Sequence, residues 1–206
     1  MRSDLIKFIS CILFHHYMPR LKLIGIVGLL SLVVAYSSIA LSISISPWFS
    51  WMENALSDLG ARQPSNVIFN LGLMLSAVLA FFFLIGLRRL HKGALGTVGV
   101  TLYALSTISL FMIGFFPETA GIIHYYVSVT FFVFVALTLI IFGAYNLIYP
   151  PRSVVLGTAL LLLSAIAIVV WLFPWRGVAI PELIASLTIS ALVVIMSVRM
   201  LNAREQ

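Results

Sequence analysis

The chain has 206 residues, of which 62% are hydrophobic and 9% are charged. Soluble domains have roughly half of their residues apolar and about a quarter charged, so a soluble fold of this size is excluded. One membrane helix needs about 20 mostly apolar residues, and the length therefore suits one helical bundle without a second soluble domain. The single cysteine, Cys11, excludes an internal disulfide and a paired-cysteine zinc site.

Six apolar runs are each long enough to span a membrane. They cover residues 21–46, 67–87, 95–116, 122–148, 154–173 and 178–200. The connections after the second run are short, which makes successive helices antiparallel neighbours. The sequence therefore predicts an all-α, polytopic membrane protein, a six-transmembrane-helix antiparallel bundle forming one domain over residues 21–201.

Basic residues are distributed very unevenly between the two ends of this bundle. With a cytoplasmic N-terminus, ten of the 12 Lys and Arg residues lie inside, and only Arg62 and Arg176 lie outside. The positive-inside rule therefore puts both termini in the cytoplasm and favours a multi-pass protein of the cell membrane. Membrane topology accounts for the net charge of +6, so we expect no nucleic-acid partner.

Residues 1–20 form a separate cytoplasmic or interfacial segment. Its apolar positions suit one face of an interfacial helix. Met18 also opens the stretch MPRLKLIGIVG, which is typical of a start before a membrane span. Residues 1–17 are then a start-site extension, and we place no function on them.

Acidic residues show the opposite bias. Glu53, Asp58, Glu118 and Glu182 all fall at outer helix ends. Acidic residues contribute little to topology, so this bias needs another explanation. The first outer loop, residues 47–66, is also long and polar enough to fold into a structure of its own.

A polar cluster is expected where the outer helix ends meet. Asp58, His124 and Glu118 are the candidate catalytic residues. The candidate residues for binding a lipid or an anion are Ser57, Asn66, Asn70, Ser128, Arg62 and Arg176. Asn66 and Asn70 are four residues apart, as are His124 and Ser128, so each pair shares one helix face.

Three interpretations of this cluster remain open. His124 with a carboxylate suits acid–base chemistry or a divalent metal, because imidazole transfers protons near neutral pH and both groups ligate metals. Three outward-facing helix N-termini suit a phosphate, assisted by an arginine. Alternatively, Asp58 and Glu118 cap helices, and the arginines pair with neighbouring acids.

Three stretches carry a resemblance to a known family. They are NALSDLGARQPSNVIFNLGL, GFFPE and IHYYVSVTFF. Together they resemble prokaryotic six-helix membrane proteins known as domain of unknown function 998, over about residues 20–200. The recurring elements fall here on Ser57, Asp58, Gly60, Asn66, Asn70, Pro117 and His124. The layout is more distantly similar to the Frag, DRAM and Sfk proteins, which are linked with membrane lipid organisation.

We predict a protein that recognises a polar lipid at the outer membrane surface. Remodelling or hydrolysis of that lipid is an extension of this prediction. Asp58 and His124 form the expected central pair, with membrane lipids as partners. The alternative is a non-enzymatic scaffold or partner-binding subunit. A small transporter is the third interpretation, and self-association stays open.

Overall fold

The computed structural model describes residues 21–203. Predictions for residues 1–20 lie outside this range. The elements are α2 (Leu21–Ser44), α3 (Asp58–Ala61), α4 (Asn66–Leu90), α5 (Gly93–Phe115), η1 (Glu118–Ala120), α6 (Ile122–Ile148), α7 (Val154–Val169), η2 (Val170–Leu172) and α8 (Ala179–Leu201). Six helical segments in this range are long and apolar enough to cross a membrane, counting α7 and η2 as one. The predicted all-α, six-span bundle is confirmed.

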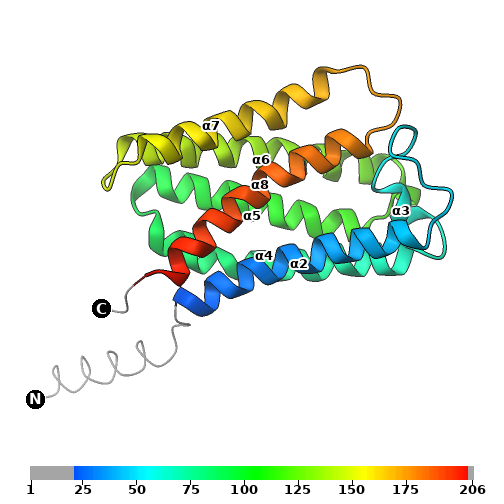
Figure 1. The fold of residues 1–206 in the computed structure, drawn as a ribbon, viewed down its shortest axis with the longest axis horizontal. Coiled ribbons are helices and arrows are strands. Elements are labelled where there is room, and N and C mark those ends of the chain that lie inside the picture. Colours follow the sequence, from blue (N-terminus) through cyan, green and yellow to red (C-terminus); the bar gives the residue numbers. More distant parts are fainter. Residues whose placement is uncertain (1–20, 204–206) are drawn as a thin grey trace, which may run out of the picture.

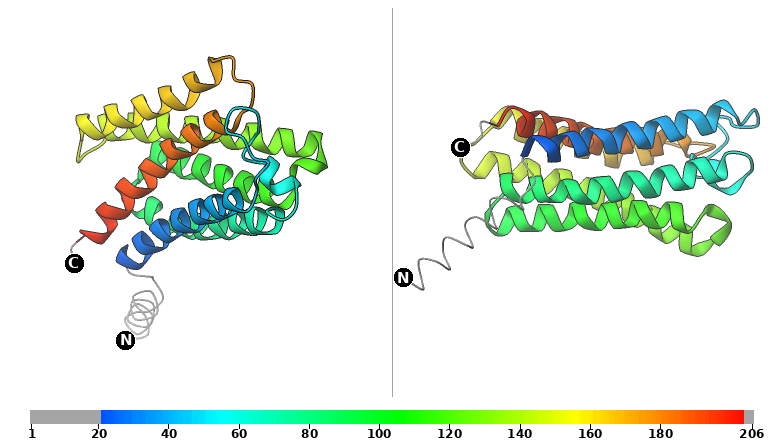
Figure 2. Two further views of the ribbon diagram at one scale, coloured as in Figure 1. Left: turned by 45° about the vertical axis from the view of Figure 1, so that its right-hand side comes forward. Right: turned by 90° about the horizontal axis from the view of Figure 1, so that it is seen from below.

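The six spans form a closed ring. Each long helix packs against the next along the chain, and α8 returns to pack against α2. Figure 1 shows the long helices running side by side, and Figure 2 shows the same bundle from two further directions. Following the predicted topology, we call the end that carries α3 the outer end and the opposite end the inner end.

Two glycines set the tight reversals between spans. Gly93 has φ +77° at the start of α5, and Gly121 has φ +63° just before α6. Residues with a side chain rarely adopt positive φ, so glycine suits both turns. Pro117 follows α5 closely and cannot continue a helix, and it thereby separates α5 from α6.

Small residues bring α6 and α7 together at the inner end. A Cβ atom added to Gly157 would lie 2.9 Å from the carbonyl oxygen of Gly143. Nearer the middle, the Ser164 hydroxyl donates to the Ala136 carbonyl at 3.0 Å. Toward the outer end the two helices diverge, and α7 rises away from α6 in Figure 1. This divergence opens a cleft between α6 and α7.

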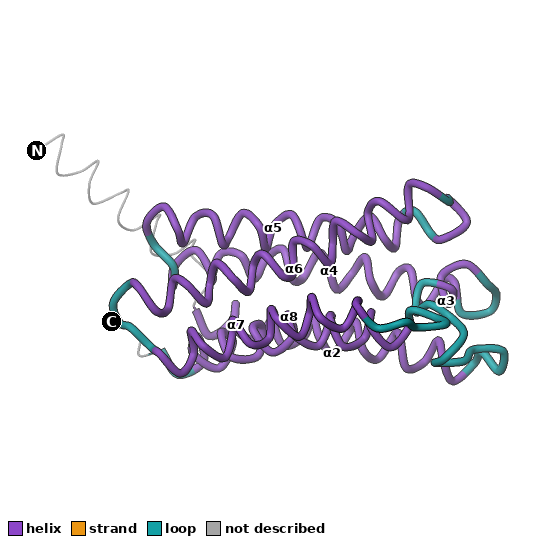
Figure 3. The backbone as a smooth tube through the Cα atoms, turned by 90° about the horizontal axis from the view of Figure 1, so that it is seen from above, coloured by secondary structure: helices purple, strands orange, loops and turns teal. Residues whose placement is uncertain are grey.

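The loop between α2 and α4 is tied to the loop before α8. Gly177 N–H donates to the Met52 carbonyl at 2.8 Å, and Ala179 N–H donates to the Asn54 carbonyl at 2.9 Å. A Cβ atom on Gly177 would lie 2.5 Å from the Asn54 nitrogen, so only glycine permits this approach. Figure 3 shows the loops gathered around α3 at the outer end.

Candidate functional site: a cleft between α6 and α7

A cleft of about 830 Å³ lies between α6 and the α7–η2 segment, and the first turns of α8 close its outer end. Its apolar walls include Val129, Val133 and Leu137 of α6, opposite Ile168 and Leu172. All five side chains are among the exposed large hydrophobic residues of the bundle. The cleft therefore opens sideways, where the bilayer surrounds the helices.

The outer end of the cleft is polar. It is lined there by Ser57, Glu118, His124, Ser128 and Glu182. These residues come from the first loop, η1, α6 and α8, so four separate segments meet at one place. The cleft thus has an apolar part along the membrane spans and a group of hydrogen-bonding side chains at its outer end.

His124 is buried and holds a partner on each ring nitrogen. Nδ1 lies 2.7 Å from the Phe116 carbonyl oxygen, and Nε2 lies 3.2 Å from Ser128 Oγ. Because a carbonyl only accepts, Nδ1 carries the proton in the neutral ring. Nε2 is then the acceptor, and the Ser128 hydroxyl donates to it.

Asp58 and Glu118 form a second pair beside the cleft. Asp58 Oδ2 accepts from the Asn54 amide at 2.8 Å and from Ala55 N–H at 3.0 Å. Its carboxyl also hydrogen-bonds to that of Glu118. Two ionised carboxylates only accept, so this contact requires a proton between them.

The two carboxyl groups do not hold that proton equally, because their pKa values shift in opposite directions. Burial, together with the hydrogen bond and negative charge of Asp58, raises the pKa of Glu118 to about 7, although Arg62 opposes the shift. Burial also disfavours ionisation of Asp58, but hydrogen bonds from Glu118, Asn54 and Ala55 outweigh it and leave the pKa of Asp58 below its usual value. Glu118 is therefore the proton donor of the pair near neutral pH.

The expected direct pairing of Asp58 with His124 is replaced by two adjacent pairs. His124 bonds to Phe116 and Ser128, and Asp58 bonds to Asn54, Ala55 and Glu118. His124 and Glu118 both line the cleft. Asp58 therefore influences the cleft through Glu118.

Glu182 is a central residue that the sequence analysis counted among the outer acids but not among the candidate site residues. Its carboxyl group is buried in the first turn of α8, and Oε2 accepts from Leu56 N–H at 2.6 Å. It lines both the cleft and an interior chamber. One signal could have identified it, since it is an isolated acid directly after Pro181 at the start of a long apolar run.

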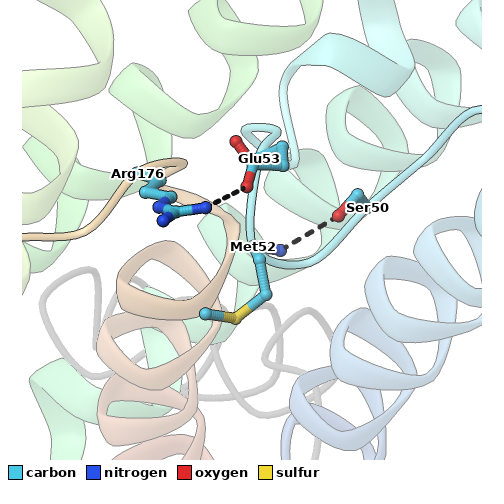
Figure 4. A network of polar contacts seen from close by, with 4 residues as sticks. All are labelled: Ser50, Met52, Glu53 and Arg176. Carbon is cyan, nitrogen blue, oxygen red and sulfur yellow. Dashed lines mark hydrogen bonds and ion pairs between the residues drawn. The ribbon is translucent and has the colours of Figure 1, made fainter.

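The two outer arginines contact other partners than the cleft residues. The Arg62 guanidinium stacks over the Trp48 ring at 4.7 Å. Arg176 Nη1 lies 3.4 Å from Glu53 Oε1, and both side chains are largely exposed. Figure 4 shows this pair beside the Ser50–Met52 turn. Neither arginine is among the residues that line the cleft.

The two asparagines of α4 are not among the residues that line the cleft. Asn70 donates its amide to the Gly60 carbonyl at 3.0 Å, and a Cβ on Gly60 would collide with Asn70 Oδ1. Asn66 begins α4 and is half-buried. Asn70 therefore holds the loop that carries Asp58, at a distance from the cleft lining.

An interior chamber of about 120 Å³ lies behind the cleft. Ser57, Ser128, Phe132 and Glu182 line both spaces. The chamber is mostly apolar, and deeper in the bundle its lining includes the hydroxyl-bearing residues Tyr36, Tyr103, Ser106, Thr107, Ser186 and Ser190. The outer polar group therefore adjoins a second space inside the bundle.

A divalent metal at the outer acids was one alternative from the sequence. Within residues 21–203, no group of three or more His, Cys, Asp and Glu side chains is arranged to hold a metal ion. The metal stays a prediction.

Comparison with known families adds one finding. A family profile described as "Protein of unknown function (DUF998)" matches residues 8–199, which include all six spans. The chain belongs to the DUF998 family. Comparisons with curated proteins and with solved structures gave no match.

Membership in DUF998 confirms the family resemblance drawn from the Ser57–Gly60 loop, Pro117 and His124. The more distant likeness to the Frag, DRAM and Sfk proteins stays a prediction, as does the prokaryotic origin. The DUF998 description names no activity. The evidence for function therefore lies in the cleft itself.

Proposed function

We propose that this integral membrane protein binds a single membrane lipid in the cleft, with an acyl chain between α6 and α7 and the headgroup at the outer polar end. The observation that carries the proposal is the shape and lining of the cleft. It is open sideways along exposed apolar residues and ends at Glu118, His124 and Glu182. A lipid has the same division into apolar and polar parts.

The size of the cleft supports this proposal. Small-molecule sites have volumes of about 300–1,000 Å³ and apolar walls with a few placed polar groups. A cleft of about 830 Å³ falls within this range. The lower walls offer only hydrocarbon to an occupant, and the exposed flank gives entry from the bilayer.

The carboxyl oxygen atoms at the polar end favour a headgroup that donates hydrogen bonds, such as an ammonium or a hydroxylated group. Glu118 and Glu182 line this end, while Arg62 and Arg176 contact Trp48 and Glu53 instead. The rings of Tyr125 and Trp171 also line the cleft. Aromatic faces attract ammonium groups, and carboxyl oxygen atoms accept hydrogen bonds from them.

This assignment differs from the anion interpretation of the cluster. A phosphate contacting Arg62 or Arg176 would lie outside the cleft lining. The lipid proposal accordingly gives no role to these two arginines. It places the protein in the cell membrane with the cleft end facing away from the cytoplasm, as the basic residues predict.

A blocking substitution tests the proposal. Val133 lines the cleft, whereas Val98 on α5 is outside its lining. Their side chains are 49% and 46% exposed, respectively. V133W should fill the cleft, and V98W adds the same bulk to another lipid-facing surface, which makes it a matched control.

Each protein is placed in nanodiscs of equal parts phosphatidylethanolamine and phosphatidylglycerol and released for native mass spectrometry. We expect wild type and V98W to retain one lipid, with phosphatidylethanolamine in excess, and V133W to lose it. Retention that is equal in V133W and V98W would contradict the proposal. An unoccupied wild-type chain would instead support the scaffold alternative.

A further inference from the structure

The hydroxyl of Ser128 has an unusual partner for a serine within a helix. Many helix hydroxyls here donate to a carbonyl one turn back, as Ser31 does to Gly28 at 2.7 Å and Ser106 to Tyr103 at 2.8 Å. Ser128 Oγ instead lies 3.2 Å from His124 Nε2. The hydroxyl is thus directed toward a proton acceptor.

The other side of the His124 ring fixes that acceptor. The Phe116 carbonyl oxygen accepts a hydrogen bond from Nδ1, with 2.7 Å between the two atoms. The lone pair of Nε2 is therefore left facing Ser128. A hydroxyl next to a base that is oriented by a third group is the arrangement that activates a serine nucleophile. Here a backbone carbonyl takes the orienting position.

Ser128 also lies at a chemically significant depth. One turn outward is His124, and one turn inward is Phe132, after which the α6 lining is apolar through Ile140. In a lipid whose headgroup is at the polar end, the ester carbonyls lie at the junction of headgroup and acyl chain. That junction is the level of Ser128, whose side chain is half-buried and lines the cleft.

We propose that Ser128 and His124 form a nucleophile–base pair that hydrolyses an acyl ester of the lipid bound in the cleft. The inference rests on the proposed function, because the cleft must first hold a lipid. It adds a reaction to that binding.

The first half-reaction transfers the acyl group to the enzyme. Ser128 Oγ attacks the ester carbonyl carbon while His124 Nε2 takes the hydroxyl proton. The bond between that carbon and the alcohol oxygen then breaks, and His124 returns the proton to the leaving alcohol. Ser128 is now acylated, and the lysolipid has gained the proton.

Water completes the reaction. A water molecule attacks the acyl-serine, His124 accepts its proton, and Ser128 leaves with that proton as the fatty acid forms. The interior chamber adjoins Ser128 directly. Its volume of about 120 Å³ is enough to hold the water that this step consumes.

Hydrogen-bond donors for the carbonyl oxygen are present at the same end. The side chains of Ser57 and Glu118 line the cleft there. Burial and the neighbouring Asp58 raise the pKa of Glu118 to about 7, so a substantial fraction of Glu118 keeps its proton at neutral pH. A protonated carboxyl can donate to a developing oxyanion.

The test uses a fluorophosphonate, which labels activated serines covalently, on the full-length protein in phosphatidylethanolamine nanodiscs. Intact mass and peptide mapping should show one label on Ser128. S128A should show none, and H124Q should label at least about 100-fold more slowly, the usual scale of general-base loss. The control S37A, an exposed α2 serine bonded to Val34, should label as wild type does.

Fatty acid released from the same nanodiscs is measured alongside by lipid mass spectrometry. Wild type should release it, and S128A and H124Q should not. A wild-type chain that retains lipid but neither labels nor releases fatty acid overturns this inference and leaves the proposed function standing. Label on another serine, or labelling unchanged in H124Q, overturns it equally. A wild-type chain that retains no lipid contradicts the proposed function itself.

Discussion

The inner and outer ends of the α6–α7 pair contrast sharply. At the inner end Gly143 and Gly157 bring the two backbones into direct contact. At the outer end the same helices separate around a cleft of about 830 Å³. Two glycines on facing helices thus close one end of the pair, and bulkier residues keep the other end open.

The two described histidines repeat this contrast. His91 and His124 each pair Nδ1 with a backbone carbonyl. The His91 ring packs against Phe142 and Tyr145 at centroid distances of 4.4 and 4.8 Å, whereas Nε2 of His124 faces a serine beside a cavity. Similar local bonding therefore gives a packing residue in one place and a candidate base in the other.

The largest effect is expected where the helices touch. G143L should lower the free energy of unfolding by about 3 kcal/mol, because overpacking a close contact strains the backbone. A Cβ at this position already lies 2.9 Å from the Leu161 side chain. The control V133L, on the open cleft, should change thermal unfolding in detergent very little. Equal losses would mean that the two ends are packed alike.

Exchanging the two histidines for alanine should separate stability from binding. H91A should cost about 2–4 kcal/mol, since it removes a buried ring from two aromatic neighbours. H124A should cost less, because its ring borders a cavity, but should reduce retention of phosphatidylethanolamine in native mass spectrometry. The contrast fails if H91A loses the lipid and H124A keeps it.

The pH dependence of stability is expected to differ between the two ends. The pKa of Glu118 rises from 4.5 to about 7 on folding. The contribution of Glu118 to the stability of the fold is therefore fully present below pH 4.5 and is lost as pH rises toward 7. The pKa of His91 falls from 6.5 to about 4, because burial disfavours its charged form. Its contribution is therefore lost as pH falls from 6.5 toward 4.

Thermal unfolding of E118Q at pH 5 and pH 8 isolates the outer contribution. At pH 8 the variant should unfold at a higher temperature than wild type, because it has no carboxylate to ionise beside Asp58. At pH 5 the two should agree closely. The stabilising contribution of Asp58, whose pKa is lowered from 3.8, is lost only below that pH range. A difference that is the same at both pH values would contradict the shared proton.

The smallest effect is expected at the exposed ion pair of Arg176 with Glu53. Such pairs contribute about 0–1 kcal/mol, so R176Q should barely change unfolding. It should also keep phosphatidylethanolamine bound, because Arg176 does not line the cleft. Loss of the lipid in R176Q would move the headgroup site to the α7–α8 loop.

The spans were predictable because each is a long apolar run between turn residues. The gathering of Ser57, Glu118, His124 and Ser128 was also predictable in outline, since their helix ends all face outward. Their individual partners were not predictable. The Asp58–Glu118 contact depends on how the first loop packs against η1, and sequence spacing does not determine that packing.

The role of Glu182 was hidden for a similar reason. Its partner is the backbone N–H of Leu56, 126 residues away, and no side-chain pattern records a backbone donor. The cleft itself arises from a divergence of α6 and α7, which apolar periodicity does not report. The arginine contacts likewise follow from loop conformation, which brings Trp48 to Arg62 and Glu53 to Arg176.

The most direct test of the central claim is to locate the lipid on the protein. Phosphatidylethanolamine with a diazirine near the end of one acyl chain is incorporated into nanodiscs, photoactivated and mapped by peptide mass spectrometry. We predict adducts concentrated on the cleft faces of α6 and α7, near Leu137 and Ile140, and their loss in V133W. Adducts spread evenly over all six spans, with V133W unchanged, would contradict the account.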